Sequence, residues 1–195
     1  MPTPQPGTEW DSEVFTKEDF TELDLRKCSF DACEFVDCKF TDADLAEAVF
    51  DDCAWTRCEF SNCKVSGTRF RSASFVECRI RGVMFSNCHV FALEFEFTQC
   101  NLSYSSFFGL HLPQTTFKDC KLNETDFGEA TLTGSKFDGS DLERTIFHRS
   151  DLTRCDMSTA TRLCLDLQNN RVKGLKISLE GAGMTLAAVG IELVL

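Results

Sequence analysis

The feature that most constrains this chain is an apolar residue at every fifth position. From Phe15, a step of five lands on an apolar side chain 16 times in succession and ends at Val90. The step resumes at Phe97 and runs to Ile177, with Arg162 as its single polar exception. A period of five fits neither a helix of 3.6 residues per turn nor the two-residue alternation of a strand. It fits a chain that turns a corner after every five residues and buries the central side chain of each five.

The length of one coil follows from a second recurrence. Residues of one kind return every twenty positions in two columns, Leu25, Leu45 and Val65 in one, and Phe15, Phe35, Trp55 and Phe75 in the other. Four sides of five residues would therefore close one coil. Coils stacked by backbone hydrogen bonds rise ~4.8 Å each, so residues 15–177 predict about eight coils and a rod roughly 40 Å long. The fold class is an all-β solenoid.

The cysteines follow the same frame. Eleven of the twelve stand two residues before a central position, and Cys164 is the exception. Alanine, serine and threonine fill this slot in other repeats, as at Ala43, Ser105 and Thr125. A zinc site needs clustered, convergent ligands such as C-x2-C pairs, and the frame supplies none. The pattern predicts small buried apolar side chains with reduced thiols, no metal and no cofactor.

The charge is negative and unevenly placed. The net charge is −11, and residues 1–60 hold 16 Asp and Glu against 5 Lys and Arg, so the whole excess lies in the first third. Direct nucleic-acid binding needs a cationic surface and is not expected. A basic partner is expected instead. The start "MPTPQPGTEW" has no basic region and no apolar run of a signal peptide, and no segment is long enough for a membrane span. We expect a cytoplasmic protein.

Nothing in the sequence indicates an enzyme. His89, His111 and His148 are scattered, and no G-x-S-x-G, P-loop or G-x-G-x-x-G motif occurs. Some β-helices are polysaccharide lyases or hydrolases, but they use longer, irregular coils with a cleft. A narrow rod with five residues per side offers no comparable pocket.

The frame slips by two residues in "HVFALEFEF", His89 to Phe97, which predicts a bulge, short loop or bend in the rod. Outward positions near the slip are apolar: Met84, Phe91, Tyr104 and Phe108. Two interpretations stay open for these side chains. They cover the irregular corner, or they form an exposed patch that binds a partner.

The tail changes pattern after Ile177. Ser178 is placed to cap a helix over 179–189 that ends at Gly190, and "IELVL" then alternates like a strand. This segment would cap the last coil or would form a C2 dimer, and we favour the dimer because an open β edge invites association. The expected interface is Leu179, Met184, Leu186, Val189, Ile191, Leu193 and Leu195. The predicted divisions are an N-terminal tail over 1–11, the solenoid over 12–177 with its break at about 89–97, and the dimerisation module over 178–195.

Short motifs carry a family resemblance. "FTDADLAEAVF", "GSDLE", "SDLTR" and "CDMST" resemble the A(D/N)LXX pattern of pentapeptide-repeat proteins. That resemblance implies a right-handed quadrilateral β-helix, here with a short C-terminal helix and strand. "CNLSYSSF", Cys100 to Phe107, and the tail "LKISLEGAGMTLAAVGIELVL" resemble the Qnr group of bacterial proteins that protect type II topoisomerases. The unbroken early frame resembles the members without loops, such as the albicidin-resistance protein.

This narrower resemblance implies a function. The chain would be a bacterial cytoplasmic DNA mimic that binds DNA gyrase, topoisomerase IV or both as a homodimer. It would protect them from quinolone-like or natural-product poisons. The alternative is a pentapeptide-repeat scaffold with a partner other than a topoisomerase. The candidate partner-binding residues are Asp42, Asp44, Glu47, Asp51, Asp52, Phe91, Glu94, Glu96, Tyr104 and Phe108.

Overall fold

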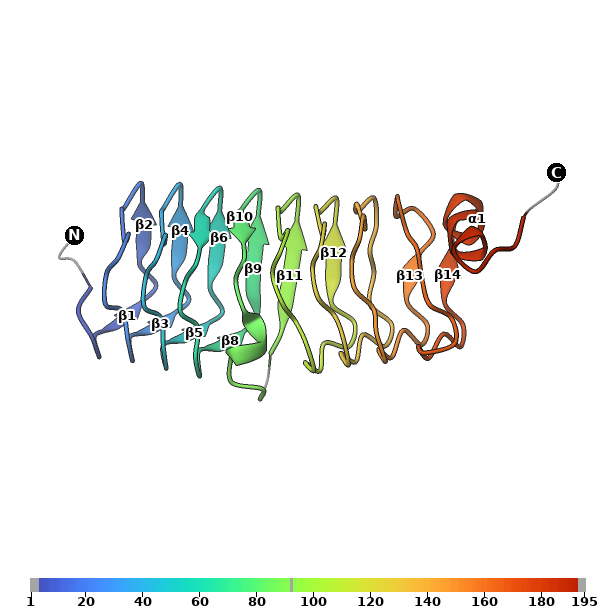
Figure 1. Ribbon diagram of the computed structural model, residues 1–195. Coiled ribbons are helices and arrows are strands. Elements are labelled where there is room, and N and C mark those ends of the chain that lie inside the picture. The colour runs from blue at the N-terminus through green and yellow to red at the C-terminus, as the bar shows by residue number, and fades with distance from the viewer. Residues whose placement is uncertain (1–3, 92, 193–195) are drawn as a thin grey trace.

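Every five-residue unit forms one side of a coil because its central residue points inward and the residue two positions later turns a corner. Corner residues hold a left-handed backbone, with φ 55° at Asp42 and 49° at Asp52. The computed structural model describes residues 4–91 and 93–192. Its four-sided coils stack into a rod (Figure 1) in which strands pair in parallel at a spacing of twenty residues, as Phe15 pairs with Phe35. The predicted right-handed quadrilateral solenoid is confirmed.

The four sides are numbered here in the order in which the chain meets them. Side 1 holds β1 (Glu9–Asp11), β3 (Ser29–Asp31), β5 (Val49–Asp51) and β8 (Arg69–Arg71). Side 2 holds β2 (Val14–Thr16), β4 (Glu34–Val36), β6 (Ala54–Thr56), β9 (Ala73–Val76), β11 (Phe95–Thr98) and β12 (Thr116–Lys118), and then β13 (Asp156–Met157) and β14 (Lys176–Ile177). Side 3 holds β7 (Glu59–Ser61) and β10 (Arg79–Arg81), and side 4 has isolated bridges and a 3-10 turn at Phe85–Asn87. The strand β1 begins at Glu9, inside the segment that was expected to be a tail.

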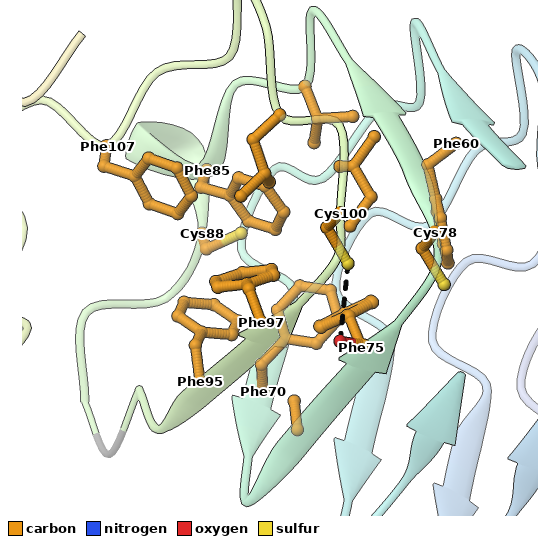
Figure 2. Close-up of a cluster of buried hydrophobic side chains, with 14 of the residues drawn as sticks. Phe60, Phe70, Phe75, Cys78, Phe85, Cys88, Phe95, Phe97, Cys100 and Phe107 are labelled. Carbon is orange, nitrogen blue, oxygen red and sulfur yellow. Dashed lines mark hydrogen bonds between the residues drawn. The ribbon is translucent and has the colours of Figure 1, made fainter. Parts of the chain in front are cut away.

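The core is a set of stacked aromatic columns. On side 2, the rings of Trp55 and Phe75 lie parallel with their centroids 4.5 Å apart, and Phe75 stacks on Phe97 at 5.1 Å. Neighbouring columns meet edge to face, as Phe85 and Phe97 do, and Figure 2 shows these rings closing the interior across the frame break. Both arrangements suit the charge distribution of aromatic rings. The core therefore runs without interruption past the slip.

The slot two residues before each centre has a second role that the sequence did not indicate. In most of the repeats that hold Cys, Ser or Thr at this slot, the side chain donates a hydrogen bond to the backbone carbonyl of a central residue in the preceding coil. Cys100 Sγ donates to Phe75 O at 3.3 Å (Figure 2), and Ser140 Oγ donates to Phe117 O at 2.9 Å. Cysteine, serine and threonine share this slot because each fits and each can donate. Eleven cysteines are buried and Cys164 is exposed, and all twelve thiols are free as predicted, but most of the buried ones are donors as well as apolar fillers.

The last coil departs from the five-residue frame. Leu167, predicted to be a buried centre, is 42% exposed, whereas Leu163 and Leu165 are buried. Asp166 causes the departure, because its Oδ1 accepts hydrogen bonds from Gln168 N and Asn169 N and holds a local turn. The prediction that the frame continues through Leu167 is therefore wrong.

The C-terminal helix α1 (Leu179–Ala188) matches the predicted position within one residue. Ser178 Oγ accepts a hydrogen bond from Gly181 N, which is the predicted N-cap. Figure 1 shows α1 lying against the end of the rod. Ile191 and Glu192 form no strand, and the rest of the predicted terminal strand lies outside the described residues. No helix within the described ranges is long and apolar enough to cross a membrane.

Candidate interaction surface

The frame break lies on side 1, between His89 and Leu93. The pairing of β11 with β9 has a spacing of 22 residues, Phe95 with Ala73, in place of 20. Two extra residues are accommodated outward, so Phe91 is 78% exposed and Val90 is 62% exposed. Val90 was predicted to be a buried centre, and that prediction is wrong because Leu93 and Phe95 turn inward in its place.

Two grooves flank this bulge. The larger, of about 570 Å³, is lined by Val90, Leu93, Glu94, Phe95, His111, Pro113, Gln114 and Thr115. The smaller, of about 310 Å³, lies over β5 and β8 and is lined by Val49, Phe50, Asp51, Arg69, Phe70, Arg71, His89 and Phe91. Val90 lines the larger groove and Phe91 the smaller one, so the bulge projects between them. Such a feature suits a protein contact better than a small substrate, because both grooves are open to solvent.

Exposed apolar side chains also occur on side 4. Met84 pairs with Ser106 in an isolated bridge, and Phe108 follows one coil later. The Phe108 ring lies over Gly128, where a Cβ atom would come within 3.0 Å of the ring. Tyr104 stands at the corner between sides 3 and 4. The structure therefore places Met84, Tyr104 and Phe108 around side 4, and Phe91 just beyond its other corner.

Glu94 lies beside the bulge, whereas Glu96 lies away from this apolar group. Glu94 accepts a hydrogen bond from Ser72 Oγ at 3.2 Å, near the corner between sides 1 and 2. Glu96 lies in β11 on side 2, which is opposite side 4. Glu94 also lines the larger groove beside the bulge, whereas a partner that covers Phe108 would have to reach around the rod to contact Glu96.

The five predicted acidic contacts extend over half a coil. Asp42 and Asp52 are exposed at corners, Asp44 lies on side 4, Glu47 at the next corner and Asp51 in β5. Three of them form ion pairs with a neighbouring coil: Asp44 with Lys64 at 3.8 Å, Glu47 with Lys27 at 3.8 Å, and Asp51 with Arg71. Asp42 and Asp52 have no ion pair among the described residues. Carboxylate oxygens of Asp31, Asp51 and Asp52 lie within 4.8 Å of one another.

These pairs belong to a twenty-residue charge pattern that the five-residue frame does not contain. Of the twelve ion pairs among the described residues, eleven join adjacent coils, and in ten of those the acid precedes the base by about twenty residues. The Arg57 guanidinium, for example, holds the pKa of the Asp37 carboxyl below its usual range. An acid at one position with a base twenty positions later was the signal in the sequence. The ladder reduces the negative potential along the middle of the rod.

The negative charge that these ion pairs do not neutralise is concentrated at the N-terminal end of the rod. The first coil, residues 8–27, carries seven carboxylates and three Lys and Arg, a net charge of −4, and the second coil, residues 28–47, carries a net charge of −5. Among the carboxylates of the first coil, Asp24 is the one that forms an ion pair within the described residues, with Arg26. The Arg26 hydrogen bonds lower the pKa of Asp24 to about 2. The end of the rod is therefore much more acidic than its middle.

The helix α1 presents two different faces. Thr185 Oγ1 accepts a hydrogen bond from Leu165 N, and Gly181 lies so close to Leu163 that a Cβ atom would stand 3.4 Å from its side chain. This face caps the last coil. Leu179, Met184, Val189 and Ile191 are exposed, Leu186 is half-buried, and Leu193 and Leu195 lie outside the described residues. The helix is thus an intramolecular cap that leaves apolar side chains toward solvent.

Comparisons with known proteins agree on the architecture. The family description "Pentapeptide repeat region" matches residues 96–162, and "Pentapeptide repeats (8 copies)" matches 19–53 and 56–89. Among solved structures, a trypsin-treated variant of QnrB1, described as a plasmid-mediated fluoroquinolone resistance protein, is 20% identical with a TM-score of 0.74, covering 97% of this chain and 92% of that one. Full-length QnrB1 is 18% identical with a TM-score of 0.56, covering 94% and 100%. No curated protein matches this chain in sequence.

Proposed function

This chain belongs to the pentapeptide-repeat family, and from that premise we propose that it is a Qnr-like protein that binds DNA gyrase, topoisomerase IV or both and protects them from poisons. The observation that carries the proposal is the likeness over 97% of the chain to a fluoroquinolone resistance protein. The sequence motifs around Cys100–Phe107 and in the tail support the same group. Protection acts by occupying a topoisomerase surface that normally contacts DNA, without direct binding of nucleic acid.

Charge density supports mimicry at the end of the rod. Duplex DNA carries about one charge per 1.7 Å, so one coil of ~4.8 Å corresponds to about three charges. The first coil carries a net charge of −4, whereas the whole chain carries −11 against roughly 23 for ~40 Å of duplex. Because the ion-pair ladder neutralises much of the middle, the first coil supplies the DNA-like attraction. The apolar bulge supplies the short-range fit.

The exposed apolar side of α1 supports a homodimer. Pairing two copies through Leu179, Met184, Leu186, Val189 and Ile191 would remove that surface from water. A C2 contact at the C-terminal ends places the two acidic first coils at the outer tips of a longer rod. Such a dimer offers a DNA-like surface at both ends.

A supercoiling assay tests the function directly. Purified gyrase is inhibited with a fluoroquinolone, and the protein is titrated in. We expect supercoiling to recover as the protein is added, with recovery also tested for topoisomerase IV. A protein with no effect on either enzyme, with fluoroquinolones and with natural-product poisons, would replace this function with that of a scaffold for another partner.

Two sets of substitutions separate the acidic and apolar contributions. Neutralising Glu9, Asp11 and Glu22 to amides should weaken rescue about five- to tenfold, most at low salt, because exposed charges act at long range. Neutralising Glu77, Asp119 and Asp138, which lie outside the first coil and form no ion pair among the described residues, removes as much charge and should change rescue little. Phe91→Ala with Phe108→Ala should weaken rescue at both salt concentrations. If the two acidic sets behave alike, mimicry by the first coil is excluded.

The dimer has its own test. Deleting 179–195 should abolish the dimer and expose the edge of the last coil, giving a monomer or an aggregate in light scattering. Met184→Glu with Val189→Glu should give a folded monomer, because both changes place charge on the exposed side of α1 and leave Thr185 in place. A double variant that stays dimeric would move the interface away from α1.

A further inference from the structure

Arg81 interrupts the ion-pair ladder. Where the ladder would place a carboxylate beside it, β10 pairs Arg81 with Ser61 in the preceding coil. In the following coil, the backbone carbonyl of Ser103 accepts from Gly82 N, so a second serine occupies the other flank. Within residues 4–91 and 93–192, Arg81 has neither an ion pair nor a side-chain hydrogen bond. Its guanidinium is therefore a cation without a counter-ion.

Tyr104 holds this guanidinium in place. Arg81 Cζ lies 5.3 Å from the centroid of the Tyr104 ring, a cation–π contact. Tyr104 has φ 66° and is the one aromatic residue among the described non-glycine residues with positive φ. A left-handed backbone is unfavourable for a bulky side chain. The ring is 51% exposed, so core packing does not account for an aromatic residue at this corner.

Two grooves meet at this pair. One of about 420 Å³ extends along side 3 toward Glu59 and Arg79, and one of about 380 Å³ extends toward Asn123 and Glu143, and both are lined by Arg81 and Tyr104. Every carboxylate that lines them is already paired: Glu59 with Arg79, Glu124 with Arg144, and Glu143 with Arg162. Arg81 is the lining cation left over.

We propose that Arg81 and Tyr104 form a recognition site for a carboxylate side chain, Asp or Glu, of a protein partner. The guanidinium presents a planar fork that binds a carboxylate through two parallel hydrogen bonds, and the Tyr104 ring fixes the plane of that fork. The nearby carboxylates of Glu59 and Glu143 repel a phosphate dianion more strongly than a single carboxylate, which favours the carboxylate. This site goes beyond the proposed function, because it binds an anion whereas DNA mimicry uses only the acidic groups.

An NMR titration tests the site without any partner. The Nε–Hε signals of Arg81 and of Arg69 are followed while acetate, and separately inorganic phosphate, is added. Arg69 lies in the same coil and has no ion pair among the described residues. We expect the Arg81 signal to shift and to saturate at millimolar acetate, and we expect the same response in Tyr104→Phe. In Tyr104→Ala, the affinity of the site for acetate should fall by at least two-thirds. Equal shifts at Arg69, or a response of Arg81 to phosphate alone, would overturn the carboxylate site.

Binding to gyrase gives a second test, because the carboxylate site and pure charge mimicry predict opposite effects of Arg81→Gln on affinity. If only negative charge mattered, Arg81→Gln would tighten binding. The carboxylate site predicts binding about tenfold weaker, partly restored in Arg81→Lys. The matched control for charge is Arg154→Gln, because Arg154 is exposed, has no ion pair among the described residues and lies outside these grooves. Tighter or unchanged binding of Arg81→Gln excludes this contact on gyrase. If the wild-type protein does not bind gyrase at all, the proposed function fails, and the acetate titration still decides the Arg81 site.

Discussion

Phe127→Ala is expected to lower the free energy of unfolding by about 3–5 kcal/mol, the cost of emptying the site of a buried aromatic ring. The Phe127 ring is fully buried and stacks between Phe107 at 5.1 Å and Phe147 at 5.5 Å, with Phe117 edge-on at 5.4 Å. Each coil contacts only its two neighbours, and both are held in register by backbone hydrogen bonds. The cavity cannot collapse without breaking that register.

The matched control for this substitution is Lys136→Ala. Lys136 is exposed and stands one residue before the central Phe137, so its removal should change stability by no more than about 0.5 kcal/mol. Both variants are compared with the wild type by urea unfolding. Similar losses in the two variants would contradict the assignment of inward and outward positions.

The sequence was sufficient to predict the regular coils because each coil repeats one local rule. Phe35, Phe75 and Phe127 take the inward position for the same reason, and the twenty-residue recurrence set the number of sides. The two errors in the five-residue frame, at Val90 and Leu167, lie where other contacts override the period. Near Val90 the chain must place Leu93 and Phe95 in the core, and near Leu167 the carboxylate of Asp166 fixes a turn. The five-residue count contains neither constraint.

The candidate surface was predictable only in part. The exposure of Phe91, Tyr104 and Phe108 followed from their outward positions, but their grouping depended on where the two extra residues are accommodated. The contact of Arg81 with Tyr104 joins residues 23 apart, and without the slip the frame would align Arg81 with Asn101 and not with Ser103. The two-residue shift at the break had to be known before Arg81 and Tyr104 could be recognised as neighbours.

The second large effect is expected at alkaline pH, where the buried thiols must remain protonated for the fold to persist. Burial raises the pKa of the Cys53, Cys63 and Cys155 thiols to about 12. In the unfolded chain a thiol titrates near 8.5. A pKa raised in the folded state gives stability that is complete below about pH 8.5 and is lost as the pH rises toward 12. Each such thiol should cost on the order of 1 kcal/mol for every pH unit in that window.

Urea unfolding from pH 7 to 11 measures this loss, and a serine variant isolates the thiols from lysine and tyrosine titration. Cys155 Sγ donates to Leu132 O at 2.8 Å, and Cys53 Sγ donates to Phe30 O at 3.4 Å. A hydroxyl preserves both hydrogen bonds and does not titrate in this range, so Cys53→Ser with Cys155→Ser should reduce the slope above pH 8.5. A thiol reagent should find Cys164 alone in the folded protein and all twelve cysteines in denaturant, because eleven are buried. Two results would contradict this prediction: a free energy of unfolding that stays constant from pH 8.5 to 10.5, or a serine variant whose pH slope equals that of the wild type. Either result would mean that the thiols ionise in the folded protein as easily as in the unfolded chain, which their burial between stacked aromatic rings does not permit.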